Sequence, residues 1–431
     1  MGFYIKVTVS TEGLTQVGTA NFGNVAIVGR ALGSGWSLNE PYVIQNPADA
    51  KALFGETSAL YNSIKLAFQN GATYVIAVPT DVEAQTPETF DGDASETEFT
   101  LTQLPAQPLD EVTIDSVPVT EGEDFVVDYG NGIVIFNSPP ATGVDNISIT
   151  YSKHTATTLS AALTRLQIED VQIIIGAMMF EEALLEDIKD HCVLMENDNP
   201  RIAFYNLPNG SVDITTAVAL LEGKLGSLIA HWQLTDVAAG VAGKASSLRP
   251  WKDLTFKPIA GLGIRQGKFT NTQFNTLNDA HVIIMYDPPK DNATTLRIHK
   301  GWNLDSSNQS PFVDQVRTAF YIAQILELGL TNPNVIGEMK MNRGGIRELN
   351  AYIRALMNPI TGPDRAIDRY TILNPAQILF ETDNPTDEQI QEIINLQASR
   401  SLTDNYAITV ECIYSGTIIH IDLVVALTGG V

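Results

Sequence analysis

The sequence predicts an α/β protein of several domains, in which a small all-β domain is inserted into an α/β core. Three patterns support this class. Buried strands alternate with helices over residues 24–80, only strand patterns occur in 85–153, and the alternation of strands and helices returns after residue 154. A chain of 431 residues is long enough for two to four domains at ~150 residues each.

The first α/β segment opens with NVAIVGRALG (24–33), a short buried strand followed by a turn. NPADAKALFG (46–55) has the pattern of a capped helix that ends at a glycine. SALYNSIKLAFQNGA (58–72) is an amphipathic helix, and TYVIAVPT (73–80) is a second buried strand. A strand, two helices and a strand in this order indicate a βαβ-like unit and therefore an α/β core.

The segment 85–153 differs from its surroundings in both period and charge. Its alternating strands are TEFTLTQLP, DEVTIDSVPVT, DFVVDYGNGIVIF and NISITYS, and YGNG is a hairpin signal. Its acidic residues are Glu88, Asp91, Asp93, Glu96, Glu98, Asp110, Glu111, Asp115, Glu121, Glu123, Asp124, Asp128 and Asp145. Lys153 is its one basic residue, so the segment carries half of the net charge of -24. Because like charges repel, we expect this inserted domain on an outer surface, away from packed neighbours.

The core resumes after the insert. Helices are predicted at TATTLSAALTRLQIED, EEALLEDIKDHCVLMEN and TTAVALLEGKLGSLIAHW, and strands at VQIIIGAM, RIAFYNLP, DAHVIIMYDPP and LRIHKGWNL (296–304). The core is therefore expected to comprise 21–84 together with 154–310.

A C-terminal domain is expected over 311–431. It contains a long helix in 310–330, the helix GGIRELNAYIRALM (344–357), and the helix NPTDEQIQEIINLQASR (384–400) with Thr386 as its N-cap. YAITVECIYSGTIIHIDLVVAL then reads as two strands joined at Ser415-Gly416.

Both ends of the chain read as strands. In residues 3–10, Ile5, Val7 and Val9 share one face, and Tyr4, Lys6 and Thr8 share the other, which is the period of a half-buried strand. In 417–431, the residues that share a face are Ile419, Ile421, Leu423 and Val425. Residues 1–20 are expected to form an N-terminal arm, with a Gly-, Thr- and Asn-containing hinge in 11–24.

The composition argues against two classes of partner. With 50 acidic against 26 basic residues, a nucleic-acid partner is not expected, since phosphate contacts need Lys and Arg. An anionic membrane surface is disfavoured for the same reason. The opening MGFYIKVTVS lacks the apolar region of a signal peptide, and the longest apolar runs are too short to span a membrane, so no membrane insertion is expected.

The sequence contains little that points to catalysis or to a cofactor. The six histidines lack metal-ligand spacing, and Cys192 and Cys412 make no disulfide framework. GLGIRQGKF (261–269) departs from a phosphate loop in its glycine spacing and in Phe269, where magnesium binding needs Ser or Thr. We therefore expect no metal, no cofactor and no enzyme activity.

One basic feature stands out. On a helix, Arg347 and Arg354 fall within about 20° of each other, and Arg343 joins them if the helix begins early enough. The apolar residues of the same helix occupy another face: they are Ile346, Leu349, Ile353 and Leu356. This arginine stripe is either a solvated face with ordinary ion pairs or a docking face for an acidic partner.

The order of these segments resembles contractile tail sheath proteins. The resemblance begins with NVAIVGRALGSG through YVIAVPT and continues in LSAALTRLQIEDVQIIIGAMM, RIAFYNLP, KPIAGLGIRQGKFTNTQFNTLNDAHVIIMY and KGWNLDSSNQSPFVDQVRTAFYIAQIL. It covers most of the chain outside the insert. The insert is similar to small β-domains that recur in phage structural proteins.

The resemblance implies a tail-sheath-like core with the insert directed outward, extended terminal arms, and a C-terminal domain that faces an inner tube. It also implies homo-oligomeric stacked rings, expected to be hexameric, with the tail tube, baseplate and tail terminator proteins as partners. The location would be the virion tail, after assembly in a host cytoplasm. In the family, terminal strands complete the sheets of neighbouring subunits, so residues 3–10 would be donated. Residues 417–431 would be either a second donated arm or part of the accepting sheet.

Two alternatives remain. A baseplate, tube or capsid-surface protein with a β-decoration would form a closed ring or a small oligomer. A secreted carbohydrate-binding or hydrolytic protein would need an aromatic platform or a buried pair of acids.

Overall fold

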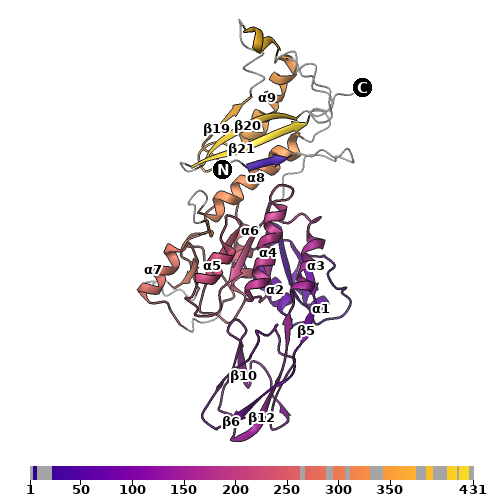
Figure 1. Ribbon diagram of the computed structural model, residues 1–431, viewed down its shortest axis with the longest axis vertical. Coiled ribbons are helices and arrows are strands. Elements are labelled where there is room, and N and C mark those ends of the chain that lie inside the picture. Colours follow the sequence, from indigo (N-terminus) through magenta and orange to yellow (C-terminus); the bar gives the residue numbers. More distant parts are fainter. Residues whose placement is uncertain are drawn as a thin grey trace. The chain divides into compact units, whose positions relative to one another are not determined.

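The computed structural model describes residues 3–6, 22–262, 267–287, 295–305, 311–330, 343–374, 385–391, 405–414 and 417–426 (Figure 1). It divides the chain into two compact units. The larger unit is Gly23–Asp314, and the smaller unit combines Met1–Phe22 with Gln315–Val431. The two ends of the chain therefore belong to the same unit. No helix in the described ranges is long and apolar enough to cross a membrane.

The larger unit is built on an eight-stranded sheet in the order β18-β17-β16-β15-β14-β2-β4-β3. Its strands are β2 (Val25–Arg30), β3 (Tyr42–Ile44), β4 (Val75–Thr80), β14 (Ile173–Gly176), β15 (Ile202–Asn206), β16 (Gly226–Ala230), β17 (Ile283–Tyr286) and β18 (Arg297–Ile298). The inner strands are parallel, and the edge strands β3 and β18 are antiparallel to their neighbours. Every residue of β2, β4, β14, β15 and β16 is buried, as in a parallel sheet that is covered on both faces. The predicted α/β class is confirmed.

Helices cover this sheet in two packed groups, α2 with α6 and α3 with α4 and α5. The helices are α1 (Pro47–Phe54), α2 (Ala59–Gln69), α3 (Ala156–Leu166), α4 (Glu182–Met195), α5 (Thr215–Leu221), α6 (Val237–Ser247) and α7 (Asn271–Asp279). The predicted cap of α1 is confirmed, since the Asn46 side chain accepts a hydrogen bond from the Asp49 amide and Gly55 ends the helix. At Gly243 of α6, a Cβ atom would lie 2.2 Å from the Ala67 carbonyl oxygen of α2. Glycine is therefore what allows these two helices to approach so closely.

The predicted helix over 215–232 is wrong beyond Leu221, because Gly226–Ala230 forms the buried strand β16. The predicted strand over 296–304 is wrong in its extent. Only Arg297–Ile298 pairs with β17. Beyond it the chain leaves the sheet, and Trp302 forms an isolated bridge with Phe312. The strand therefore ends at Ile298, although the sequence pattern that predicted it extends to residue 304.

The insert is all-β, as its period predicted. A two-stranded stalk of β5 (Val82–Ala84) and β13 (Ser152–His154) leads into it. The sheet β10-β11-β7 and the sheet β6-β12-β8-β9 form its body. The strands are β6 (Glu88–Gly92), β7 (Glu98–Thr100), β8 (Glu111–Ile114), β9 (Val117–Pro118), β10 (Phe125–Asp128), β11 (Ile133–Phe136) and β12 (Gly143–Thr150). Phe99, Phe125 and Phe136 pack ring against ring in its core, and the YGNG hairpin joins β10 to β11.

The smaller unit contains a four-stranded sheet in the order β1-β21-β20-β19. The strands are β1 (Phe3–Lys6), β19 (Arg369–Leu373), β20 (Asn405–Tyr414) and β21 (Thr417–Ala426), and the helices are α8 (Val313–Leu330), α9 (Arg343–Met357) and the 3-10 turn η1 (Asn358–Ile360). Thr386 and Gln389 cap each other at the start of a helix over 387–391, as predicted. The rest of that predicted helix, 392–400, and the Ser415-Gly416 turn lie outside the described residues.

Candidate functional site

The terminal sheet brings together the two ends of the chain. β20 and β21 form a ten-residue antiparallel ladder that runs from Asn405 opposite Ala426 to Tyr414 opposite Thr417. β1 then pairs in parallel with β21, with Phe3 opposite Ile421 and Lys6 opposite Val424. β21 is therefore an inner strand, while β1 and β19 lie at the two edges of the sheet.

Alternate residues of β20 form the core of this sheet. Ile408, Val410, Cys412 and Tyr414 are buried, whereas Glu411 and Ile413 are only half-buried. Burial raises the pKa of the Cys412 thiol to about 12. Cys412 is therefore a neutral packing residue at physiological pH.

The predicted strand residues fall on these ladders as far as the structure describes them. Tyr4, Ile5 and Lys6 lie in β1, opposite Asp422, Leu423 and Val424. Val7, Thr8 and Val9 lie outside the described residues. Ile419, Ile421, Leu423 and Val425 all lie in β21, paired in register with Cys412, Val410, Ile408 and Tyr406. Within a single copy, the N-terminal strand thus adds to the sheet of its own chain.

α9 carries the predicted arginine stripe. It begins at Arg343, early enough to include all three arginines, although the side chain of Arg343 is not among those described. Arg347 and Arg354 are exposed, while Ile346, Leu349 and Ile353 are buried on the opposite side of the helix. Two turns separate the exposed arginines, which corresponds to about 10 Å along the helix axis.

Two further exposed arginines occur in this unit, and the sequence did not single them out. Arg365 and Arg369 are exposed in the segment that follows η1 and enters β19. Burial raises the pKa of Tyr370 in β19, and the nearby Arg354 opposes that rise. The Tyr370 hydroxyl donates to Asn358 Oδ1 at 2.8 Å, and buried Asn374 donates to Asn350 Oδ1 of α9 at 2.7 Å. These bonds connect α9 and η1 to the region of the edge strand β19. No spacing in the sequence signals Arg365 and Arg369, because neither lies in a helix.

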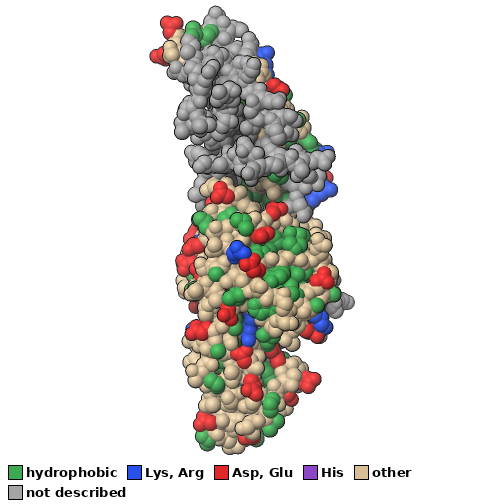
Figure 2. All heavy atoms as spheres, turned by 90° about the vertical axis from the view of Figure 1, so that its right-hand side faces the viewer, with side chains coloured by type: hydrophobic (Ala, Val, Ile, Leu, Met, Phe, Trp, Pro, Cys, Tyr) green, Lys and Arg blue, Asp and Glu red, His purple; other side chains and the backbone are tan. Residues whose placement is uncertain are grey.

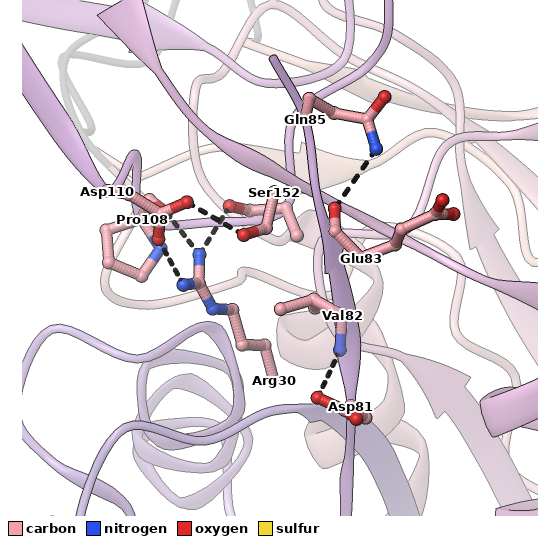
Figure 3. A network of polar contacts seen from close by, with 9 residues as sticks. Arg30, Asp81, Val82, Glu83, Gln85, Pro108, Asp110 and Ser152 are labelled. Atoms are coloured by element: carbon pink, nitrogen blue, oxygen red, sulfur yellow. Dashed lines mark hydrogen bonds and ion pairs between the residues drawn. The ribbon is translucent and has the colours of Figure 1, made fainter. Parts of the chain in front are cut away.

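In the larger unit, Arg30 attaches the insert to the core (Figure 3). It is the last residue of β2 and is 8% exposed. Its Nη1 donates to the carbonyl oxygens of Ala106 at 3.2 Å and Pro108 at 2.6 Å, and its Nη2 forms an ion pair with Asp110. Asp110 also accepts a hydrogen bond from Ser152 Oγ of the stalk at 2.7 Å. One guanidinium group therefore holds both a loop and the stalk of the insert.

The stalk also contains a buried neutral histidine. In the part of the chain that the structure describes, no group forms a hydrogen bond with either ring nitrogen of His154 in β13. Burial, and to a lesser degree the charge of Arg30, lower the pKa of His154 to about 4. The ring is therefore uncharged at neutral pH and acts as an apolar filler at the root of the insert.

A second polar cluster connects the insert to the end of β15. Asn131 Nδ2 donates to the Asn209 carbonyl oxygen at 2.9 Å, and Asn209 Nδ2 donates to Asp128 Oδ2 at 3.1 Å. A Cβ at Gly130 would lie 3.0 Å from Pro208. The insert thus rests on the core at two places, and both lie at carboxyl ends of core strands.

The carboxyl ends of the core strands are also where an open α/β sheet usually binds ligands, at the point where the strand order reverses. Here that point lies between β2 and β14. Nearby, the buried carboxylate of Asp236 accepts hydrogen bonds from Ser63 Oγ at 2.5 Å, Asn206 Nδ2 at 2.7 Å and two backbone amides. Burial raises the pKa of Asp236, and its hydrogen bonds oppose that rise. With four donors, Asp236 is a structural residue that ties α6 to the sheet.

No group of three or more His, Cys, Asp or Glu side chains that could hold a metal ion occurs among the described residues. Cys192 is buried, and burial raises the pKa of its thiol to about 12. The surfaces of interest are therefore those that can contact other chains: the terminal sheet, α9 and the insert.

Solved structures of sheath proteins share this fold along nearly the whole chain. The sheath tail protein of Desulfitobacterium hafniense is 11% identical with a TM-score of 0.58, and the match covers 97% of this chain and 100% of that one. The sheath tail protein Lin1278 of Listeria innocua is 12% identical with a TM-score of 0.55, and the match covers 96% of each chain. A chain of the anti-feeding prophage baseplate is 11% identical with a TM-score of 0.54, covering 98% of this chain and 97% of that one.

The sequence by itself matches no protein-family model and no curated protein. The fold is nevertheless shared with known proteins. The chain has the fold of contractile tail sheath proteins, which the resemblance in its sequence predicted, and its structural neighbours come from tail sheaths and from contractile injection systems.

Proposed function

We propose that this protein is a structural subunit of a contractile tail sheath. The observation that carries the proposal is the match to the whole length of solved sheath tail proteins, with 97% of this chain and 100% of the other covered. The subunits would polymerise as stacked rings around an inner tube, and contraction would drive the tube through a target envelope. The work would be mechanical, without enzyme activity, metal or cofactor.

Exchange of the N-terminal strand would connect the subunits. β1 lies at the edge of the terminal sheet, and the four residues of it that the structure describes pair with β21. An edge strand can leave its own sheet and pair in the same register with a neighbour's sheet, since the backbone hydrogen bonds are the same in both arrangements. In this proposal β1 of one copy occupies the position beside β21 of the next copy, and the hinge in 11–24 permits the crossing.

The strand order also bears on the C-terminal end. β21 lies between β1 and β20, so it is an inner strand of the sheet that would receive the arm. This supports the second of the two alternatives for 417–431, in which that segment belongs to the accepting sheet and is not donated.

The partners and the location follow from the same role. The arginine stripe of α9 would face an acidic inner tube, and the baseplate and tail terminator proteins would bind the two ends of the sheath. The insert would lie on the outside, on the virion tail or on an injection device, after assembly in the host cytoplasm. At ~25 cal/mol per Å², each ~300 Å² of apolar surface that contraction buries would contribute roughly 7 kcal/mol per subunit.

One observation favours a second candidate, a baseplate component. The match to a chain of the six-fold symmetrised anti-feeding prophage baseplate covers 98% of this chain. A baseplate component would form a closed ring of fixed size, whereas a sheath protein would form tubes of variable length. Negative-stain electron microscopy of the purified protein distinguishes the two.

Deletion of residues 1–12 tests the role of the arm. We expect the truncated chain to keep its circular dichroism spectrum and melting temperature but to lose the polymers. Ile5→Pro should act in the same way because it removes a backbone donor, while Ile5→Val should assemble normally. Ordered tubes from the truncated chain would contradict the proposal.

Exchange between copies can be detected directly, because Ile5 is opposite Leu423. Chains with Ile5→Cys are mixed with chains with Leu423→Cys, assembled, oxidised and analysed under denaturing conditions. A disulfide-linked dimer is expected. As a matched control, Ile5→Cys is mixed with Ile168→Cys, which is 83% exposed on the other unit, and no dimer should form. If dimers are absent while a double variant carries an internal disulfide within assembled tubes, the strand stays on its own chain and exchange is refuted.

A further inference from the structure

An aromatic cluster lies at the β17–β18 end of the core sheet. The His299 ring is 4.6 Å from Phe274 of α7, 5.5 Å from Tyr286 of β17 and 6.5 Å from Phe256, measured between ring centroids. Phe256 is 56% exposed, and the other three side chains are half-buried. We call these four residues the aromatic patch. It is a continuous ring surface that solvent reaches.

Phe256 is held outward by a strained backbone. Its φ is 60°, in the left-handed region that bulky side chains rarely adopt. The conformation is maintained because the Phe256 amide donates to the Ile298 carbonyl oxygen at 2.8 Å and the Ile298 amide donates to the Lys257 carbonyl oxygen at 3.0 Å. Strained residues of this kind cluster at functional sites, where the surrounding structure imposes them. The fold thus presents an aromatic ring to solvent at an energetic cost.

Lysines accompany the patch in a protein that is otherwise acidic. Residues 244–300 contain nine Lys and Arg against four Asp, while the whole chain carries -24. Lys257 follows Phe256 directly, and Lys300 is close enough to lower the pKa of His299, after the larger effect of burial. Lys300 also lies 4.7 Å from the centroid of the Trp302 ring. Among the described residues, neither Lys257 nor Lys300 forms an ion pair.

The tip of the insert has the complementary chemistry. Asp91 accepts a hydrogen bond from the Asp145 amide at 2.7 Å, and the exposed Asp115 donates its amide to the Asn146 carbonyl oxygen at 2.7 Å, so three carboxylates gather there. Exposed valines accompany them: Val144 is 82% exposed and Val117 is 62% exposed. The two surfaces are complementary, because the carboxylates of the tip can pair with the lysines of the patch and the valines can pack against the aromatic rings. In the view of Figure 2, acidic side chains are spread over the insert and the core, and few basic side chains are visible.

The insert of the same chain is poorly placed to reach this patch. The insert also contacts the core at Asn209, after β15, but its stalk leaves the core at β4 and β13, and β4 is five strand positions from β17 in the sheet. At ~4.8 Å per strand this is about 24 Å across the sheet. In Figure 1, β5 at the root of the insert and α7, which carries Phe274, lie on opposite sides of the larger unit. A second copy of this chain carries a surface with this complementary chemistry.

We propose that the aromatic patch of one copy, with Lys257 and Lys300, binds the acidic tip of the insert of a second copy. This contact depends on the proposed sheath role in one respect: copies of the chain must associate with one another. It would place the aromatic patch toward the outer surface, where the insert is proposed to lie, and it would give the insert a structural role in holding adjacent subunits.

Charge exchange between two variants tests this contact. The patch variant carries Lys257→Glu and Lys300→Glu, and the tip variant carries Asp91→Lys and Asp145→Lys. Each variant alone should lose at least tenfold in the apparent association constant measured by sedimentation velocity. An equimolar mixture of the two variants should recover most of the lost association constant, because the basic tip of one variant can pair with the acidic patch of the other. Lys51→Glu with Lys65→Glu, on helices away from both surfaces, serves as the matched control and should associate like the wild type.

A second measurement identifies the contacting groups. A carbodiimide joins amines to carboxylates that are in contact, so wild-type copies labelled with ¹⁵N are mixed with unlabelled copies and cross-linked. Peptides that join Lys257 or Lys300 to the insert should carry one labelled and one unlabelled half. If both variants associate as tightly as the wild type, or if the mixture gains nothing over either variant, the contact is refuted while the sheath proposal stands. If the wild type itself stays monomeric at all concentrations tested, both proposals fail.

Discussion

The guanidinium of Arg30 forms an ion pair with the carboxylate of Asp110, and this pair joins the core of the larger unit to its insert. The side chain of Arg30 is 9% exposed and that of Asp110 is 29% exposed. Breaking a charge pair in such a position is costly, because removal of one partner leaves the charge of the other without compensation.

Arg30→Ala should therefore lower the free energy of unfolding of the larger unit by about 3 kcal/mol. The carbonyl oxygens of Ala106 and Pro108 lose their donor at the same time. Urea titration followed by tryptophan fluorescence measures the loss, and limited proteolysis should cut the insert first. The matched control is Lys51→Ala, which breaks the exposed pair between Lys51 and Glu56 and should cause no measurable change. Equal stability of both variants would contradict the anchoring role of Arg30.

His154 predicts a dependence of stability on pH. The pKa of His154 is lowered to about 4 in the folded protein, against about 6.5 in the unfolded chain. The group therefore contributes its full stability above pH 6.5, and this contribution is lost as the pH falls toward 4, because the unfolded state then binds a proton that the folded state rejects. The loss amounts to roughly 3 kcal/mol.

Comparison of the wild type with His154→Phe isolates this effect. The variant should lose less stability than the wild type between pH 6.5 and 4, as measured by urea titration at each pH. The pKa values of His191 and His231 are also lowered to about 4 by burial, so the wild type and the variant should both retain an acid sensitivity from these two residues. Parallel curves for the two proteins would show that His154 titrates normally.

The arginine stripe predicts that tube binding can be separated from self-assembly. Arg347→Glu with Arg354→Glu should abolish co-sedimentation with an acidic tube protein while the variant still forms its own polymers, since both side chains are exposed on α9. Contacts between exposed charges weaken as salt screens them, so tube binding by the wild type should also fall steeply between about 0.1 and 1 M salt.

The control for the stripe is Arg165→Glu, which reverses an exposed arginine of the larger unit that pairs with Glu40. This variant should bind the tube normally. Undiminished binding by the double α9 variant would assign the stripe to an ordinary solvated face, which was the first of the two interpretations of its sequence.

Both native thiols should be inert in the folded protein. Burial raises the pKa of Cys192 and of Cys412 to about 12, so the thiolate is almost absent at pH 8. Neither should react with an aromatic disulfide reagent until the protein is unfolded in urea. Ile168→Cys adds a thiol at a position that is 83% exposed and should react within minutes. Rapid reaction of the wild type would contradict the burial of either cysteine.

The local elements could be predicted from the sequence because their signals lie within a few residues. Asn46 and Gly55 delimit α1 through hydrogen bonds that a single turn contains. The YGNG hairpin has the same local origin. The strand predicted over 296–304 failed because Leu296 and Ile298 are buried alternately while the chain beyond them leaves the sheet, and periodicity does not reveal that departure.

The sites were less predictable than the elements. The stripe on α9 followed from helical spacing, but its proximity to Tyr370 depends on how α9 packs against β19. The aromatic patch was missed because Phe256, Phe274, Tyr286 and His299 come from four separate segments. Segments that are distant in the chain meet only through packing, which leaves no spacing to detect.

The sequence by itself determined the strand character of both chain ends, the α/β class of the core, the all-β insert and its acidity. These depend on residue type and period, which are local properties. Only the tertiary structure decided that β1 lies beside β21, that Arg30 faces Asp110, and that Phe256 points to solvent. Each of these results from packing between segments that are distant in the sequence. Many segments could serve as a partner by their local sequence, and the simultaneous burial of many side chains selects one of them.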